Sequence, residues 1–104
     1  MHSMDRLADA PPEPQIFLVE RYWPDIDETH ARALAADLER AAEAMAAEGI
    51  RVEHVGSILM PRDGVVFSLI SASDEAVARQ LTARAGAPAD RTAVAIRLTH
   101  GGRW

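Results

Sequence analysis

Histidine and carboxylate side chains are the groups in this sequence best suited to bind a metal ion. The four histidines are His2, His30, His54 and His100. They form no HxH, HxxxH or HExxH pattern, so the sequence carries no specific zinc signature. His30 follows Asp27 by three residues, a spacing that places both side chains on neighbouring positions of one helix face. A site built from imidazole and carboxylate groups would suit nickel, zinc or manganese.

The stretch FLVERYWP offers a second place for chemistry, because an apolar run ends in the adjacent charges Glu20 and Arg21. Side chains alternate along a strand, so these two project to opposite faces of a sheet. The fold predicted below brings them to the same end of the sheet as Asp90 and Arg91. Glu20 can then pair with Arg91, and Arg21 with Asp90, which would lock a loop to the strand. The alternative is that one carboxylate closes a pocket and binds a cation or a substrate.

These observations define two groups of candidate residues. The candidates for a metal site are Glu20, Asp27, His30 and His54. They need not form one site, because His54 is predicted at the opposite end of the sheet from the others. The candidates for ligand binding or for the structural lock are Arg21, Asp90 and Arg91.

Nucleophilic catalysis is not predicted from the sequence. The chain contains no cysteine and no GxSxG pattern. No evident base stands beside the serines Ser57, Ser68, Ser71 and Ser73 in the sequence. We therefore assign no catalytic residue, and the question whether the protein is an enzyme stays open, with the balance against it.

Length and composition limit the classes of protein to consider. The 104 residues are enough for one domain with a modest core. The formal net charge is −5 and the basic residues, all arginine, are scattered, which argues against nucleic acid as a partner. The absence of cysteine excludes disulfides and thiolate metal sites. The sequence has no apolar run near the ~18 residues of a membrane span and no signal-peptide pattern at its start. We expect a cytoplasmic protein.

Hydrophobic periodicity predicts six elements in the order βαββαβ. The strands are predicted at residues 15–22, 51–60, 65–71 and 92–99, and the helices at residues 28–48 and 75–85. Prolines crowd the first segment, which we interpret as a flexible leader. The predicted organisation is a leader at 1–14, a domain at 15–100 and a tail at 101–104.

This order of elements predicts an α+β, ferredoxin-like fold. Its antiparallel sheet has the strand order 4-1-3-2, with both helices on one face. The third and fourth strands, VVFSLIS and AVAIRL, are apolar on both faces, whereas a sheet with one solvated face alternates apolar and polar residues. We therefore expect a second copy of the chain to cover the open face in a homodimer. The alternative is an apolar patch that binds a different partner.

Three stretches, FLVERYWP, AAEGI and RAGAPADRTAVAI, together resemble a small family of bacterial ferredoxin-like proteins. The family is catalogued as a domain of unknown function, and its characterised members are described as nickel-binding. The resemblance covers about residues 15–99. Its most distinctive patterns fall on Val19, Glu20, Arg21 and Pro24, and on Gly86, Pro88, Asp90 and Arg91. The resemblance implies a homodimer that binds a divalent metal, with no established reaction.

The sequence departs from the family pattern in two strands. Family members often carry a histidine directly before the serine of the second strand. Here Gly56 precedes Ser57, and the nearest histidine, His54, stands two residues earlier than in the pattern. A cysteine common in the third strand is also absent, and Phe67 and Ser68 occupy that region.

The expected function is therefore that of a small dimeric protein that binds nickel or another divalent metal. The alternative is a dimeric α/β-barrel-type enzyme or ligand-binding protein with a pocket between sheet and helices, which rests on analogy of fold. A third hypothesis is a partner-binding module that uses the open sheet face or the proline-rich leader.

Overall fold

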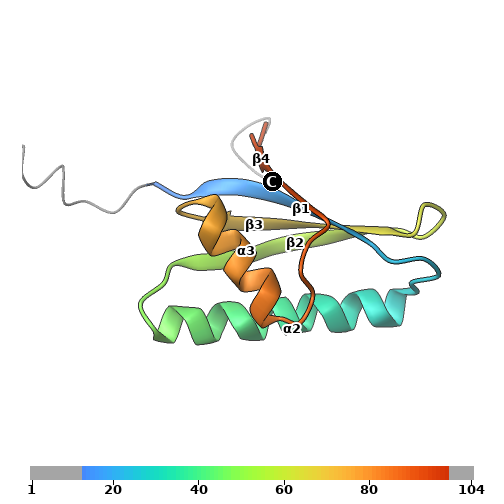
Figure 1. Ribbon diagram of the computed structural model, residues 1–104, viewed down its shortest axis with the longest axis horizontal. Helices are drawn as coiled ribbons and strands as arrows, with labels where there is room; N and C mark the ends of the chain where they lie inside the picture. The colour runs from blue at the N-terminus through green and yellow to red at the C-terminus, as the bar shows by residue number, and fades with distance from the viewer. Residues whose placement is uncertain (1–12, 99–104) are drawn as a thin grey trace, which may run out of the picture.

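A computed structural model describes residues 13–98 and contains six elements (Figure 1). In chain order they are β1 (Gln15–Tyr22), α2 (Glu28–Ala47), β2 (Val52–Met60), β3 (Val65–Ala72), α3 (Glu75–Arg84) and β4 (Arg91–Ala95). The predicted order βαββαβ is confirmed. The predicted tail, and the predicted leader apart from its last two residues, lie outside the described residues.

The predicted boundaries agree with the observed ones within one residue at every element except the last strand. That strand was expected at 92–99 and instead covers Arg91–Ala95. Its partner is β1, where Ala95 stands opposite Ile16, the second residue of the strand. Before Ile16, β1 has only Gln15, and the residue before that is Pro14, which has no N–H to donate to a ladder. The prediction failed because apolar sequence continues past the end of the strand available for pairing.

The four strands form one antiparallel sheet in the order β2-β3-β1-β4. This is the predicted order 4-1-3-2 read from the other edge, and the α+β class is confirmed. Both helices pack on the same face of the sheet, because their buried residues share one core with Phe17, Val66 and Ile70. Figure 1 shows the long α2 below β2 and α3 lying obliquely in front of the strands, with its lower end at α2. Strands β2 and β4 are the sheet edges, and α2 runs along β2 at the first of them.

The core lies between the sheet and the helices. On the sheet side, Phe17, Val66 and Ile70 are almost completely buried. The face of α2 that meets them carries the predicted apolar stripe, namely Leu34, Leu38, Ala41, Ala42 and Met45, and all five side chains are buried. From α3 the core receives Ala78, Leu81 and Thr82. Across residues 13–98 no helix is both long enough and apolar enough to cross a membrane.

Local signals in the sequence set the ends of the helices and the hairpin. Asp27 and Asp74 cap α2 and α3, because the carboxylate of each accepts the backbone N–H three residues later. Gly49 follows α2 with φ +87°, a left-handed conformation that suits glycine. Gly64 ends the β2–β3 hairpin at φ +60°, and its carbonyl accepts the N–H of Trp23 at 2.7 Å. The hairpin is thereby tied to the loop after β1.

The open face of the sheet carries a run of apolar side chains on β1, β2 and β3, with Glu20, Glu53 and Ser71 beside it. Register places the side chains of Leu18, Phe67 and Ile58 there, on the side opposite the helices. Leu18 and Phe67 are half-buried, and Ile58 is 55% exposed. The open face of β3 is apolar at Val65, Phe67 and Leu69, as the alternation analysis predicted, and polar at Ser71. We define Ile16, Leu18, Ile58, Met60, Phe67 and Leu69 as the open-face patch.

Candidate functional site

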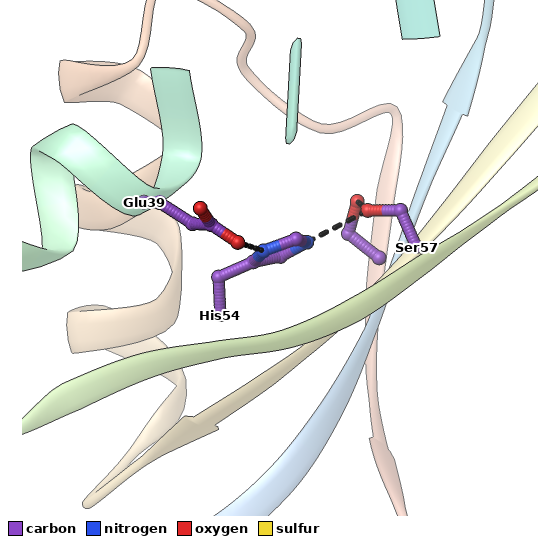
Figure 2. Close-up of polar contacts among 4 residues, drawn as sticks. Glu39, His54 and Ser57 are labelled. Atoms are coloured by element: carbon purple, nitrogen blue, oxygen red, sulfur yellow. Dashed lines mark hydrogen bonds and ion pairs between the residues drawn. The ribbon is translucent and has the colours of Figure 1, made fainter. Parts of the chain in front are cut away.

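Four polar side chains form a continuous hydrogen-bonded chain on the helix side of the sheet, which we call the polar relay: Glu39, His54, Ser57 and Ser68. Nδ1 of His54 lies 3.4 Å from Oε2 of Glu39, which is on α2, and its Nε2 lies 2.8 Å from Oγ of Ser57. The same Oγ lies 2.8 Å from Oγ of Ser68 on β3. Figure 2 shows Glu39 and Ser57 at opposite ends of the imidazole ring.

A β-bulge in β2 makes this arrangement possible. His54 is paired with Ile70 and Gly56 with Leu69, so Val55 is an extra residue in the ladder. In a regular strand His54 and Ser57, which are three positions apart, would point to opposite faces. The bulge changes the alternation by one residue, and both side chains therefore point toward α2.

Burial differs sharply along the polar relay. The side chain of His54 is 4% exposed and that of Glu39 is 64% exposed. Ser68 is 3% exposed, whereas Ser57 lies at the surface. The relay therefore carries a hydrogen-bonded path from a solvated carboxylate, through a buried ring, to an exposed hydroxyl.

The chemistry of the four groups fixes the direction of the relay. An ionised carboxylate accepts hydrogen bonds and donates none. The Nδ1 of a neutral His54 facing Glu39 therefore carries the proton, and Nε2 is the acceptor. It follows that Ser57 donates to His54 and that Ser68 donates to Ser57. Each of the three hydrogen bonds in the relay then has one donor and one acceptor.

Two grooves follow one another along the seam between α2 and β2, and the relay stands between them. The first has a volume of about 440 Å³ and is lined by Ser57 together with Ala31, Ala35, Leu59, Pro61, Val66 and the Glu28–Arg32 ion pair. The second, about 330 Å³, is lined by Glu39, His54 and neighbouring residues of α2 and β2. A third hollow of about 550 Å³ lies at the end of the sheet around Gly49 and Ser71. Of these three hollows, the first contains the serine end of the relay, at Ser57, and the second contains its carboxylate end, at Glu39.

The structure overturns one expectation from the sequence. Ser57 was expected to have no base beside it, yet His54 lies within hydrogen-bond distance of its hydroxyl. The bulge is the physical reason. The residues missed in the site were Glu39, Ser57 and Ser68. The hairpin register places Ser57 opposite Ser68, and this pairing was accessible from the sequence because Met60 and Val65 flank the turn.

The remaining metal candidates do not converge. Asp27 and His30 meet at the start of α2, where Nδ1 of His30 lies 2.7 Å from Oδ1 of Asp27. The backbone N–H of His30 and its ring both lower the pKa of Asp27. Glu20 lies on β1 opposite Arg91, and His54 belongs to the relay. Across residues 13–98 no group of three or more histidine, cysteine or acidic side chains is placed to hold one metal ion.

The loop before β4 is attached to β1 mainly through backbone groups. The N–H of Asp90 donates to the carbonyl of Glu20 at 2.9 Å, and its carboxylate accepts the N–H of Tyr22 at 2.6 Å. Arg21 donates from Nη1 to the carbonyl of Pro88 at 2.9 Å, and its guanidinium lies 5.4 Å from the ring centre of Trp23. The Nε of Arg21 is buried without a hydrogen-bond partner.

On the opposite face of the sheet, Glu20 acts on the phenol of Tyr22 at the end of β1. Hydrogen bonding to Glu20, and its negative charge, raise the pKa of the Tyr22 phenol. The candidate locking residues Arg21, Asp90 and Arg91 thus gather at one end of the sheet. Their described contacts attach a loop to a strand and do not enclose a ligand pocket.

Comparison with known proteins gives information on the fold. No protein-family model matches the chain, and no curated protein matches it. Among solved structures it is similar to the crystal structure of SCO4226 from Streptomyces coelicolor A3(2), with a TM-score of 0.64 and 17% sequence identity. The similarity covers 82% of this chain and 99% of that chain. At this level of identity, the two chains are shown to share a fold.

Proposed function

We propose that this chain is a small ferredoxin-like protein that binds a small molecule in the groove lined by Ser57, between α2 and β2. The observation that carries the proposal is the polar relay, which ends at the surface residue Ser57 in a groove whose other lining residues are apolar apart from the Glu28–Arg32 pair. Binding sites commonly combine apolar walls with a few placed polar groups. A buried histidine held from both sides is such a group, because it fixes the orientation of the hydroxyl that a ligand would meet.

The lining of the groove indicates the chemistry of its ligand. Ala31, Ala35 and Leu59 offer apolar contact, and Ser57 offers one hydrogen-bonding oxygen. The charges at the rim neutralise one another, because Arg32 lies 2.6 Å from Glu28. The hydroxyl proton of Ser57 is already donated to His54, so its oxygen can only accept a hydrogen bond from a ligand. We therefore expect an uncharged molecule with a short apolar body and one hydroxyl or amide N–H donor.

The test uses N-butylacetamide, a stable molecule of this class, and nitrogen–proton NMR spectra of the full chain. Saturable shifts at Ala31, Ala35 and Ser57 are expected. Ala35→Phe should abolish them by filling the groove, whereas Ala33→Phe, on the exposed side of the same helix, should not. Shifts that are absent, or that are equal in both variants, refute the proposed site.

We also propose that the protein is a homodimer in which two open-face patches meet. The support is apolar exposure, since Ile58 and Met60 are 55% and 42% exposed in the single chain, and exposed apolar surface of this kind favours association. Light scattering should give twice the mass of the chain, and a monomeric mass at micromolar concentration would refute the dimer.

A divalent metal is a second candidate ligand, favoured by the juxtaposition of the Glu39 carboxylate and Nδ1 of His54 at 3.4 Å. Imidazole nitrogen with carboxylate oxygen suits nickel, and the family resemblance agrees. Two protein donors leave the other positions to water or to the partner copy. In calorimetry with nickel alone, His54→Ala should abolish the heat of binding and His30→Ala should preserve it. The converse result would place the metal at Asp27 and His30, and no heat in the wild type would refute metal binding.

A further inference from the structure

We propose that Ser57 is a nucleophile activated by His54, and that the protein hydrolyses small uncharged esters of short acyl chains. This inference rests on the proposed ligand site in the same groove and adds a reaction to it. The geometry that carries it is the relay from Glu39 through His54 to Ser57, which places a carboxylate, an imidazole and a hydroxyl in hydrogen-bonded series.

The distance between His54 and Ser57 meets the requirement for an activated serine, and the carboxylate of Glu39 lies 3.4 Å from the other ring nitrogen. A base must lie about 2.6–3.2 Å from the hydroxyl whose proton it accepts, and Nε2 of His54 lies 2.8 Å from Oγ of Ser57. Glu39 acts as a positioning residue, because its carboxylate holds the ring in the form that is protonated at Nδ1 and leaves Nε2 free to accept. The same charge stabilises the imidazolium that forms when the serine proton is transferred.

Accessibility and burial assign different roles to the two serines. Ser57 is exposed to the first groove, so a substrate carbonyl can reach it. Ser68 is 3% exposed and cannot be reached in the same way. Its hydroxyl donates to Oγ of Ser57 and therefore stabilises the negative charge that develops there when the proton leaves.

The chemical step needs no redox partner. Oγ of Ser57 forms a bond to the carbonyl carbon while its proton moves to Nε2 of His54. The bond from that carbon to the ester oxygen then breaks, and His54 returns the proton to the departing alkoxide. The alcohol leaves. Water then attacks the acyl carbon while His54 accepts one of its protons, the bond from that carbon to Oγ of Ser57 breaks, and His54 returns the proton to Oγ, which releases a carboxylic acid and restores Ser57.

The groove restricts the substrate to a small acyl group. The groove has a volume of about 440 Å³, and its apolar side is formed by Ala31, Ala35, Leu59 and Val66. The Glu28–Arg32 pair leaves no unbalanced charge to attract an anion. Short-chain esters fit these walls, whereas phosphate esters and charged peptides lack a matching group.

The experiment measures hydrolysis of p-nitrophenyl butyrate and covalent labelling by a fluorophosphonate probe, with the labelled residue located by mass spectrometry. The chain has no lysine or cysteine to react in competition. Labelling is expected at Ser57. Because general-base assistance is worth about 10²–10⁴-fold, His54→Gln should lower the labelling rate by at least about 100-fold, and Ser57→Ala should abolish labelling. The matched control is Ser71→Ala, a serine on β3 outside the relay, and it should react like the wild type.

Two further measurements separate the outcomes. Nitrogen chemical shifts of the His54 ring should show the proton on Nδ1 in the wild type, and Glu39→Ala should weaken that preference together with the labelling rate. If N-butylacetamide binds at Ser57 and the serine is not labelled, the nucleophile proposal is wrong while the proposed ligand site stands. If neither binding nor labelling occurs, both are wrong. Labelling that persists in His54→Gln, with circular dichroism unchanged, also overturns the proposal.

Discussion

Removing one partner of the hydrogen bond between Ser57 and Ser68 should destabilise the fold more than removing the other, because only the Ser68 hydroxyl is deeply buried. Ser57→Ala leaves the Ser68 hydroxyl buried, with 3% exposure, and without its described acceptor. It also removes the described hydrogen-bond partner of Nε2 of the buried His54. An unsatisfied buried polar group costs about 1–3 kcal/mol. Ser68→Ala removes the buried member and leaves Ser57 with His54 and with solvent. That substitution should cost only about 0.5–1.5 kcal/mol, the net value of one hydrogen bond.

The double variant is decisive, because it removes the buried hydroxyl together with its acceptor. The Ser57→Ala, Ser68→Ala chain should be at least as stable as Ser57→Ala alone, which gives a coupling energy of roughly 1 kcal/mol or more between the two sites. Urea unfolding followed by circular dichroism measures this. With an m value of about 1–2 kcal/mol/M for a domain of this size, the midpoint of Ser57→Ala should fall by roughly 1 M.

Two results would refute the reasoning. Additive free energies for the two single substitutions would mean that the serines do not share a hydrogen bond. A Ser68→Ala variant less stable than Ser57→Ala would mean that the buried hydroxyl has a stronger partner than Ser57. Equal m values in all four chains are the control that the variants unfold between comparable states.

Three other predictions concern the frame around the site. Arg84 lowers the pKa of Glu48 below its ordinary 4.5, so the ion pair stabilises the fold above that pH and this stabilisation is lost as the pH falls through the lowered pKa. Glu48→Gln should therefore make the melting temperature depend less steeply on pH in the acid range. An unchanged slope would count against the pair. Gly49→Ala should lower the free energy of unfolding by about 1–2 kcal/mol, because alanine is strained in a left-handed backbone conformation. Gly64→Ala should lower it more, because a Cβ there would also lie 3.2 Å from a backbone atom of the loop after β1. Equal unfolding midpoints in urea for the two variants would contradict this. Phe67→Glu, in the open-face patch, should halve the mass measured by light scattering, and a persistent dimer would locate the interface elsewhere.

Most of the frame could be predicted because its signals are local. The apolar stripe of α2, the capping aspartates and the turn glycines each act within a few residues, and they fixed five of the six elements to within one residue. The order of the strands followed from the chirality and shortness of the connections. The end of β4 was not local, because it depends on where the partner strand β1 begins.

The site was less predictable, because it depends on three alignments between distant residues. The pairing of Ser57 with Ser68 was implicit in the hairpin register. The bulge at Val55 had one weak signal, a glycine inside a strand at Gly56. The approach of Glu39 had none, since α2 carries several exposed acidic residues and helical periodicity does not say which of them lies beside His54. At the other end of the sheet, the partition of side chains correctly brought the loop of Asp90 to β1, but backbone groups form most of the attachment.

The bulge has a consequence for how the site responds to a change in chain length. Deletion of Val55 would leave His54 and Ser57 two positions apart in a regular strand, and alternation would still place both side chains on the face toward α2. The bulge therefore absorbs one extra residue without turning either side chain away, so the loss of a single codon at this position would keep the arrangement. If the same residue were accommodated without a bulge, one of the two side chains would turn to the opposite face. At this position the local irregularity of the strand, as much as residue identity, determines whether the side chains meet.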